Sequence, residues 1–337
     1  MRGFRRSGPR TRAGARENTG GSMAGIRAVR FHDFGGPEVL AGEAIARPTL
    51  KDGDVLVRVH AAGVNPLDTK MRQGFYKSMF PKPFPVIPGW DFSGVIESVG
   101  RGVKEWKAGD AVYGRPDFMR DGSYADYIAV KETEIARKPE TIGHVHAAAV
   151  PLAALTAWQA MFDIAKLEAG QRILIHAAAG GVGILAVQLA KWNGAYVYAT
   201  ASAGNRNSVK SFGADETIDY NAGKFEDVVK DVDVVFDLVG REVLARSWGV
   251  LKKGGVLVTG TGEPSQEEAA KHGVRAAMVR VLPNRAELDQ ISKLIDSGLL
   301  KPYVGVALPL EQARKAHELV ETRHGRGKVV LRIAGKN

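Results

Sequence analysis

A glycine-rich corner at residues 178–183 has the residue types and spacing that hold a dinucleotide. Read as G-x-G-x-x-G, it places Ala178, Gly180 and Gly183, with Gly181 added. Glycines let the backbone approach a pyrophosphate and let a helix pack closely on a strand, while the N–H groups of the first helical turn face the phosphates. The residues that we predict to line the dinucleotide are Ala179, Gly180, Gly181, Val182 and Gly183.

The context of this corner supports the prediction. The apolar run RILIH precedes it, and apolar residues recur at helical spacing after it. A glycine triplet alone is weak evidence for dinucleotide binding, because glycines also occur in ordinary tight turns. Strand, corner and helix together are the context that the dinucleotide motif requires.

The segment after the second strand of this unit favours NADPH as the cofactor. An enzyme specific for NAD usually places an acid there to bond the ribose 2′-hydroxyl, and residues 195–213 contain none. They offer Ser202, Asn205 and Arg206, whose donors suit a 2′-phosphate. A solvated charge at Arg206 and a helix cap at Ser202 are the alternative. Tyr220, at the end of the third strand, lies either against the adenosine or in the core.

Two different patterns surround the corner and define the elements that must position it. From Ile26 to about Val150, short β-branched and aromatic runs lie between turn signals and predict a small, mostly antiparallel β domain. Its predicted strands cover residues 26–31, 55–62, 92–100, 110–114 and 124–130.

From Gln171 to about Ser297, predicted strands alternate with helices, which indicates a doubly wound parallel sheet. These strands cover residues 172–176, 196–200, 216–220, 232–237, 255–260 and 274–281. The last part of the chain again has the pattern of the β domain. It contains predicted strands at 304–310 and 328–333 and a helix near 310–324. The parallel sheet is therefore predicted to be inserted into a β domain, with the active site in the cleft between them.

Composition excludes several classes of protein. The chain has 337 residues, 45% hydrophobic and 25% charged, which is enough for two domains with their own cores. It has no cysteine, so disulfides, thiolate zinc sites and cysteine nucleophiles are excluded. No uninterrupted apolar run reaches the ~18–20 residues of a membrane span, and we predict no membrane contact.

Half of the net charge of +10 lies at the N-terminus. Residues 1–22 hold six arginines and one acid, a charge of 6 − 1 = +5, and few large apolar residues. We expect a disordered basic tail, which is a flexible extension, an expression remnant, the product of an upstream start codon or a targeting segment. The remaining +5 favours anionic ligands, and without an RNA- or DNA-binding signature it does not point to nucleic acid.

Ten segments in a fixed order then identify a family. They are FGGPEVL, AAGVNPLDTKMRQGFY, PVIPGWDFSGVIESVG, GDAVYG, GSYADYIAV, PLAALTAWQAM, AAAGGVGILAVQLAK, FGADETIDY, DVVFDLVG and GRGKVVL. In order and spacing they resemble the zinc-independent quinone oxidoreductase and enoyl reductase branch of the medium-chain dehydrogenase/reductase superfamily. The likeness covers nearly the whole chain from Met23.

The resemblance implies an α/β fold in which a GroES-like, β-rich catalytic domain contains an inserted Rossmann doubly wound parallel-sheet domain. We place the tail at 1–22, the catalytic domain at 23–150 and 299–337, and the NADP-binding domain at 151–298. The resemblance also implies NADPH as the cofactor and a homodimer. We expect a cytoplasmic location.

The family pattern points away from zinc. Zinc alcohol dehydrogenases carry Gly-His-Glu where this chain has Gly89, Trp90 and Asp91. A second set, His317, Glu321 and His324, shares one helix face, but it lacks the second histidine of the H-E-x-x-H zinc motif. We therefore predict no metal site.

The resemblance assigns the catalytic residues. Asn65 is expected near the nicotinamide ribose, and Tyr76 is expected in the active site, either as the hydroxyl that donates a proton or as a wall of the pocket. Asp68 is expected to brace the helix that follows it. His60 and His176 are expected to be structural histidines.

The match departs from the family at one cofactor contact. Several relatives carry a lysine for the cofactor phosphate where this chain has Asn205, which leaves use of both NADPH and NADH open. Arg326 and Lys328 are either further neighbours of the phosphates or the adenine, or solvent-facing residues.

These residues predict an NADPH-dependent, zinc-independent oxidoreductase that reduces a quinone or the activated C=C bond of an α,β-unsaturated carbonyl. One alternative is an enoyl-thioester reductase acting on a CoA or carrier-protein substrate, for which Lys77 and Lys82 supply basic residues. An alternative of another class is an NADPH-binding protein that binds RNA or a protein partner.

Overall fold

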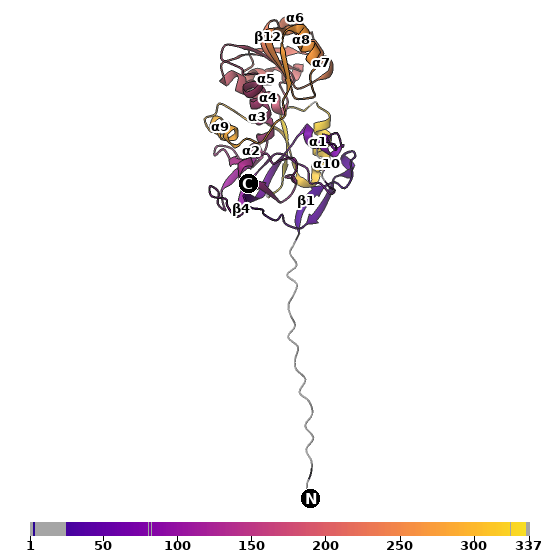
Figure 1. Cartoon of the computed structure of the whole chain (residues 1–337), viewed down its shortest axis with the longest axis vertical. Helices are drawn as coiled ribbons and strands as arrows, with labels where there is room; N and C mark the ends of the chain where they lie inside the picture. The colour runs from indigo at the N-terminus through magenta and orange to yellow at the C-terminus, as the bar shows by residue number, and fades with distance from the viewer. Residues whose placement is uncertain (1–2, 4–24, 80, 82, 324, 335–337) are drawn as a thin grey trace.

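The computed structural model describes residues 3, 25–79, 81, 83–323 and 325–334. The chain forms two lobes, and the C-terminal segment returns to the lobe that contains the first strands (Figure 1). The predicted basic tail at 1–22 lies outside the described residues except for Gly3.

The catalytic lobe is built on a seven-stranded sheet with the order β14-β15-β3-β4-β5-β7, in which β6 also pairs with β3. Its strands are β3 (Asp54–Val64), β4 (Phe92–Val99), β5 (Ala111–Gly114), β6 (Tyr127–Lys131), β7 (Ile135–Arg137), β14 (Val304–Pro309) and β15 (Lys328–Arg332). A separate antiparallel pair consists of β1 (Ile26–Arg30) and β2 (Ala41–Ile45). Because β15 pairs antiparallel with β3, strands from both ends of the chain share one sheet.

The second lobe is a six-stranded parallel sheet with the order β10-β9-β8-β11-β12-β13, the Rossmann order. The strands are β8 (Arg172–Ile175), β9 (Tyr196–Ala201), β10 (Glu216–Asp219), β11 (Val232–Asp237), β12 (Leu251–Thr259) and β13 (Arg275–Met278). All six residues of β11 are buried, as expected for a central parallel strand covered on both faces. The predicted insertion of a Rossmann domain into a β-rich domain is confirmed.

The helices complete the two lobes. They are α1 (Pro66–Arg72), α2 (His144–Ala147), α3 (Pro151–Trp158), α4 (Gly181–Trp192), α5 (Arg206–Ser211), α6 (Phe225–Val228), α7 (Arg241–Ser247), α8 (Gln266–His272), α9 (Arg285–Asp296) and α10 (Ala313–Glu321). Helix α9 ties the lobes together, because the Tyr113 hydroxyl donates to the Leu288 carbonyl at 2.7 Å and accepts from Ser292 Oγ at 2.9 Å.

The segment His144–Ile164 corrects the expectation that no stretch is long enough to cross a membrane. It joins α2, α3 and a π-helical turn, η3 (Gln159–Ile164), into 21 residues with a mean hydropathy of 1.3 over its most apolar window. However, 78% of that window is buried, and α3 packs against α4 and α9. Its apolar character is therefore explained by the core between the lobes.

One predicted strand is too long. The apolar run at 274–281 suggested a strand over its whole length, but β13 ends at Met278. Beyond β13, the backbone N–H of Leu282 donates to Gln159 Oε1 at 2.9 Å, and the Leu282 carbonyl accepts from Gln159 Nε2 at 2.9 Å. These bonds hold the chain against η3 and place Val281 beside the catalytic lobe.

Candidate active site

The glycine corner forms the tight junction between β8 and α4. Ala177 adopts a positive φ of 52°, and α4 begins at Gly181. A Cβ atom on Gly183 would lie 2.4 Å from the Ala177 carbonyl oxygen and 2.6 Å from Ala178 Cα. Only glycine therefore allows the helix to approach the strand this closely. Ala179 and Val182 lie in the same junction, next to the free N–H groups at the start of the helix.

The C-terminal strand of the catalytic lobe lies directly against this corner. Gly327 N donates to the Ala179 carbonyl at 2.9 Å, and Gly180 and Gly327 form a parallel bridge. A Cβ atom on Gly181 would lie 2.5 Å from Lys328 Cδ. The absence of a side chain at Gly181 therefore makes room for the Lys328 stem, which packs against the Rossmann lobe while its ammonium group bonds Asn65 and Asp91 of the catalytic lobe.

Lys328 ends in a buried polar cluster with Asn65 and Asp91. Its Nζ donates to Asp91 Oδ2 at 2.9 Å and to Asn65 Oδ1 at 2.5 Å, while Asn65 Nδ2 donates to Asp91 Oδ2 at 2.8 Å. The other oxygen of Asp91 accepts from Leu152 N at 2.5 Å. The cluster fixes the orientation of the Asn65 amide at the point where the two lobes meet.

Sequence reasoning did not find this cluster as a unit. Asn65 was predicted as a nicotinamide neighbour and Lys328 as a phosphate or adenine neighbour, whereas Asp91 was noted only as a departure from the zinc motif. The only local sign of the cluster is Asp91 itself, an acid directly after Trp90, which replaces the histidine ligand of the zinc alcohol dehydrogenases. The partner of that acid lies 237 residues away, too far for any local pattern to show.

Asp68 braces the start of α1, as expected. Its Oδ2 accepts from Asn65 N at 2.6 Å and from the Tyr124 hydroxyl at 3.4 Å. Burial raises the pKa of the Asp68 carboxyl to about 7. A short polar chain continues to His317, whose Nε2 lies 3.3 Å from the Tyr124 hydroxyl.

Tyr76 lies in the turn that follows α1, half-buried against an apolar wall. Burial raises the pKa of its hydroxyl above the usual value, so the phenol remains a proton donor at neutral pH. The wall joins both lobes and consists of Leu67, Met71, Trp90, Phe118, Leu152 and Val281.

The residues predicted for the cofactor's 2′-phosphate and adenosine lie together at the carboxyl ends of β9 and β10. Asn205 Nδ2 donates to Ser202 Oγ at 3.2 Å, and Arg206 Nε donates to Thr217 Oγ1 at 3.4 Å. Ser202 makes no side-chain helix cap, contrary to its alternative role. Tyr220 is 51% exposed, so the alternative of a core aromatic is wrong.

The predicted structural histidines are buried or stacked. Both ring nitrogens of His176 have hydroxyl partners, Thr200 and Ser247, each at 3.1 Å, and burial lowers its pKa to about 3. His60 stacks on His144 with ring centroids 4.3 Å apart.

Within the described ranges, no group of three or more His, Asp or Glu side chains could hold a metal ion. In the helix-face set considered above, Glu321 pairs with Arg72, and His324 lies outside the described residues. Trp90 is fully buried in the apolar wall, and an indole cannot act as a zinc ligand.

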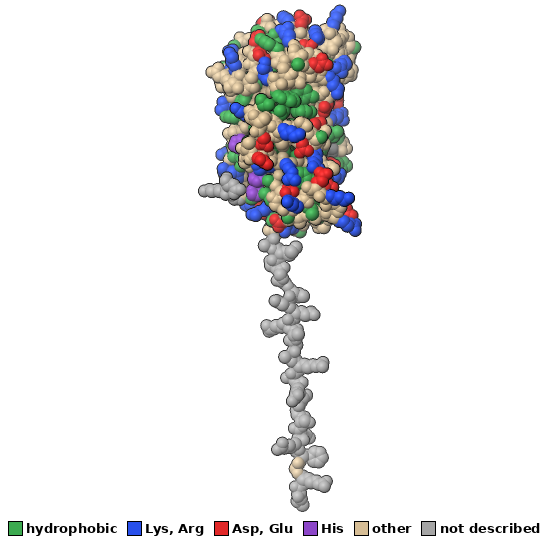
Figure 2. Space-filling model, turned by 90° about the vertical axis from the view of Figure 1, so that its left-hand side faces the viewer, with side chains coloured by type: hydrophobic (Ala, Val, Ile, Leu, Met, Phe, Trp, Pro, Cys, Tyr) green, Lys and Arg blue, Asp and Glu red, His purple; other side chains and the backbone are tan. Residues whose placement is uncertain are grey.

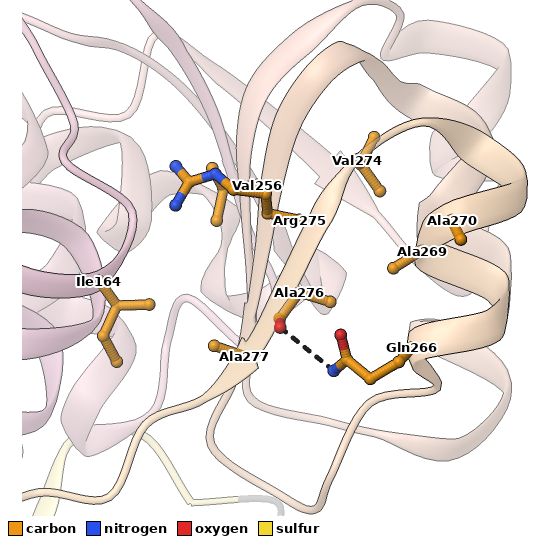
Figure 3. Close-up of a pocket in the computed structure, with 9 residues that line it drawn as sticks. All are labelled: Ile164, Val256, Gln266, Ala269, Ala270, Val274, Arg275, Ala276 and Ala277. Atoms are coloured by element: carbon orange, nitrogen blue, oxygen red, sulfur yellow. Dashed lines mark hydrogen bonds between the residues drawn. The ribbon is translucent and has the colours of Figure 1, made fainter.

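A separate cavity of about 430 Å³ lies beside the edge strand β13, away from these residues. Ile164, Val256 and Arg275 line it on one side and α8 on the other, where Gln266 Nε2 donates to the Ala276 carbonyl at 3.3 Å (Figure 3). None of the predicted site residues lines it.

Comparison with known proteins matches this arrangement. Residues 51–140 match the alcohol dehydrogenase GroES-like domain, and residues 212–331 match a domain described as a zinc-binding dehydrogenase. An NADPH-dependent alkenal/one oxidoreductase of Arabidopsis thaliana, described as chloroplastic, is 38% identical over 91% of this chain and 79% of its own length. The chain belongs to the medium-chain dehydrogenase/reductase family, in its quinone oxidoreductase branch.

Solved structures of this family agree with that assignment. A quinone oxidoreductase from Coxiella burnetii is 36% identical, with a TM-score of 0.86 over 92% of this chain and 99% of that one. The Escherichia coli quinone oxidoreductase, solved in complex with NADPH, is 30% identical, with a TM-score of 0.83 over 91% and 99% of the two chains. The predicted family and fold are thereby confirmed.

Proposed function

We propose that this protein is an NADPH-dependent, zinc-independent oxidoreductase that reduces a quinone or the activated C=C bond of an α,β-unsaturated carbonyl. The observation that carries the proposal is the junction of the lobes. There the Lys328 stem packs on the glycine corner, and its Nζ holds Asn65 at the start of α1, the helix that carries Leu67 and Met71 of the apolar wall. Relatives in the same family are described as NADPH-dependent alkenal/one oxidoreductase and as quinone oxidoreductase.

The residues of the Rossmann lobe fit a bound NADPH. No side chain stands at Gly180, where the cofactor's pyrophosphate is expected to approach, and Gly183 brings the helix N-terminus close to the strand. Ser202, Asn205 and Arg206 hold donors in reach of a 2′-phosphate. Tyr220 offers an exposed ring for the adenosine. When bound, NADPH supplies a hydride to the β-carbon of the enone and becomes NADP⁺.

The catalytic lobe orients the substrate and supplies the proton. Asp91 and Lys328 fix the Asn65 amide in the junction, beside the position expected for the nicotinamide ribose. The apolar wall excludes water from the reacting carbons, which strengthens hydrogen bonds made there. The Tyr76 hydroxyl stays protonated and can donate its proton to the enolate that hydride transfer creates.

The experiment is NADPH consumption by the purified protein with a naphthoquinone, a simple enone, a 2-alkenal and an enoyl thioester, each repeated with NADH and with Tyr76→Phe. We expect turnover of the quinone or the enone with NADPH. If Tyr76 donates the proton, kcat for the enone falls about 10²-fold in the variant while the quinone rate changes less. Absence of turnover by every substrate, although NADPH binds, would contradict the proposal.

The two alternatives gain no specific support. Of the lysines invoked for a thioester substrate, Lys77 is exposed, and Lys82 lies outside the described residues. For a nucleic-acid partner, a single-sign surface would be expected. On the face drawn in Figure 2, Lys and Arg side chains interleave with Asp and Glu.

We also propose a homodimer and a cytoplasmic location. In support of the dimer, β13 pairs only with β12 among the strands that the structure describes and leaves an edge beside the cavity of Figure 3. A mass of twice 36.2 kDa by light scattering, falling to 36.2 kDa in Ala277→Arg on this edge, would support it. A monomeric wild-type protein would overturn the proposed dimer.

The proposed cytoplasmic location is tested by cell fractionation.

A further inference from the structure

Arg115 is a buried cation next to the polar cluster of the active site. It follows the last residue of β5, and β5 pairs antiparallel with β4 so that Gly114 lies opposite Phe92. Continuing the same register by one residue brings Arg115 opposite Asp91. The Arg115 side chain is nevertheless almost fully buried, with 1% of the residue exposed.

Two of the three guanidinium nitrogens lack the hydrogen bonds that such a group normally makes, as far as the described residues go. Nε and Nη2 of Arg115 are buried and make no hydrogen bond within the part of the chain that the structure describes. Its carbon Cζ lies 3.9 Å from the centre of the Phe118 ring. Burial lowers the pKa of Arg115 to about 10, so the group still carries its charge at neutral pH. Buried donors that make no hydrogen bond are costly, even though Asp91, Asp117 and Glu134 attract the charge from nearby.

Another arginine of the same loop shows the ordinary arrangement. Arg120 makes a bidentate pair with Asp54, at 2.8 Å from Nη1 to Oδ1 and 2.7 Å from Nη2 to Oδ2. The loop that carries both arginines is therefore anchored to the sheet. Arg115 is held in a fixed position by this anchor and by the Phe118 ring.

The acids around Arg115 already have other partners. Asp91 accepts from Lys328, Asn65 and Leu152 N. Asp117 Oδ1 accepts from Met119 N at 2.9 Å, and Glu134 Oε2 accepts from Lys131 N at 3.2 Å. Neither acid makes a hydrogen bond to the Arg115 atoms named above.

The ring under Arg115 belongs to the wall of the proposed substrate pocket. Phe118 meets Trp90 edge to face, with ring centroids 5.6 Å apart. Trp90 is fully buried in the same wall as Tyr76, and its Nε1 has no hydrogen-bond partner among the described residues. Two donors for which the described residues supply no acceptor, one on Arg115 and one on Trp90, therefore both neighbour the Phe118 ring.

We propose that Arg115, assisted by Trp90 Nε1, binds the carboxylate of an acidic substrate, so that the preferred substrate is a short α,β-unsaturated carbonyl compound that carries a carboxylate. A guanidinium matches the planar geometry of a carboxylate and binds it through two hydrogen bonds. The carboxylate must lie only a few bonds from the C=C bond, because Arg115 neighbours Asp91 and Asp91 neighbours Asn65. This inference rests on the reductase function proposed above.

The test compares (E)-3-benzoylacrylate with its methyl ester, which is uncharged and is the intrinsically more reactive hydride acceptor, so that a preference for the acid must come from binding. We expect kcat/KM for the acid to exceed that for the ester by about tenfold or more in the wild type. Arg115→Met should abolish this preference, mainly by raising KM for the acid, while the ester changes by about twofold at most. Arg115→Lys keeps the positive charge but loses the planar pair of N–H donors, so it should retain part of the preference for the acid.

Two further measurements keep the test decisive if the buried arginine is needed for folding. Arg101→Met, a change at an arginine whose side chain is 86% exposed, serves as the matched control and should leave the preference unchanged. In the wild type, the saturated product acid 3-benzoylpropionate should inhibit ester reduction competitively against the ester, and its methyl ester should inhibit at least about tenfold less.

The outcomes separate the two proposals. If the wild type reduces the ester and a naphthoquinone but shows no preference for the acid, or if Arg115→Met keeps the preference, the carboxylate site is wrong and the reductase function stands. If the wild type reduces none of the three compounds with NADPH, the proposed function itself fails.

Discussion

The two lobes present different kinds of groups at the proposed cofactor site. The Rossmann lobe offers a backbone corner built of small residues and, beyond β9, polar groups such as the half-buried Ser202 and the exposed Arg206. The catalytic lobe offers buried side chains, Asn65, Asp91 and Lys328, that bind one another. A backbone site depends on shape, whereas a buried polar cluster depends on every partner being present. The same kind of substitution should therefore have different consequences in the two lobes.

The largest effect is expected from Lys328→Met. The change leaves Asp91 buried without its counter-charge, which should lower the free energy of unfolding by about 3–5 kcal/mol. Lys191→Met is the matched control, because its ion pair with Asp215 has the same 2.9 Å separation but side chains that are 36% and 26% exposed. That control should cost at most about 1 kcal/mol. Urea unfolding measures both, and equal losses would contradict the distinction.

Gly183→Ala tests the shape of the backbone corner. The new Cβ would collide with the Ala177 carbonyl oxygen at 2.4 Å, a backbone atom that cannot rotate away. We expect a loss of about 1–3 kcal/mol in the free energy of unfolding and weaker NADPH binding, measured by fluorescence titration. Gly249→Ala, where a Cβ meets nothing within 4 Å, is the control. Unchanged NADPH affinity in Gly183→Ala would show that the corner does not hold the cofactor.

Asp68 makes the catalytic lobe sensitive to pH. Its folded pKa of about 7 exceeds the ordinary carboxyl value, so between about pH 4 and 7 the folded state binds more protons than the unfolded state. The stabilisation is present at low pH and is lost as pH rises toward 7, with a slope of at most about 1.4 kcal/mol per pH unit.

Asp68→Asn should remove that slope, because an amide does not titrate. Unfolding by urea at pH 5, 6 and 7 compares the variant with the wild type. The difference in stability between them should shift steadily in favour of the variant as pH rises. A difference independent of pH would mean that Asp68 is ionised throughout.

Arg206→Ala is expected to have the smallest effect, because this side chain is exposed. Loss of a contact with the 2′-phosphate should raise KM for NADPH by about tenfold and leave KM for NADH unchanged. Lys210→Ala, on the exposed side of the same helix, is the control and should alter neither value. An equal increase for both cofactors would place Arg206 away from the 2′-phosphate.

The sequence predicts local features of this molecule well and distant contacts poorly. The corner at 178–183 and the six parallel strands depend on short-range pattern, and both are present. The end of β13 depends on Gln159, more than a hundred residues earlier, so the apolar run at 274–281 predicted too long a strand. The helical segment 144–164 is longer than its uninterrupted apolar runs, because Pro151 lies at the first turn of α3, where proline is tolerated.

The residues of the candidate site also divide into those that local sequence predicts and those that only the folded structure shows. Asn65 and Tyr76 were predicted from the family pattern, and the role of each stays a prediction. The pairing of Asp91 with Lys328 and the position of Arg115 required the sheet, because β15 brings residue 328 next to β3 and the pairing of β4 with β5 places Arg115 opposite Asp91. Nothing in the local sequence distinguishes Arg115 from the paired Arg120.

The central claim is that the two lobes together transfer a hydride from NADPH to an activated carbon, and isotope transfer tests it directly. The protein is incubated with an enone and NADPH carrying deuterium at the transferable C4 position, and the product is examined by NMR. We predict one deuterium at the β-carbon of the saturated ketone and, when the reaction is run in D₂O with unlabelled NADPH, one at the α-carbon. Oxidation of NADPH without deuterium at the β-carbon, or no reduced product at all, would contradict the account.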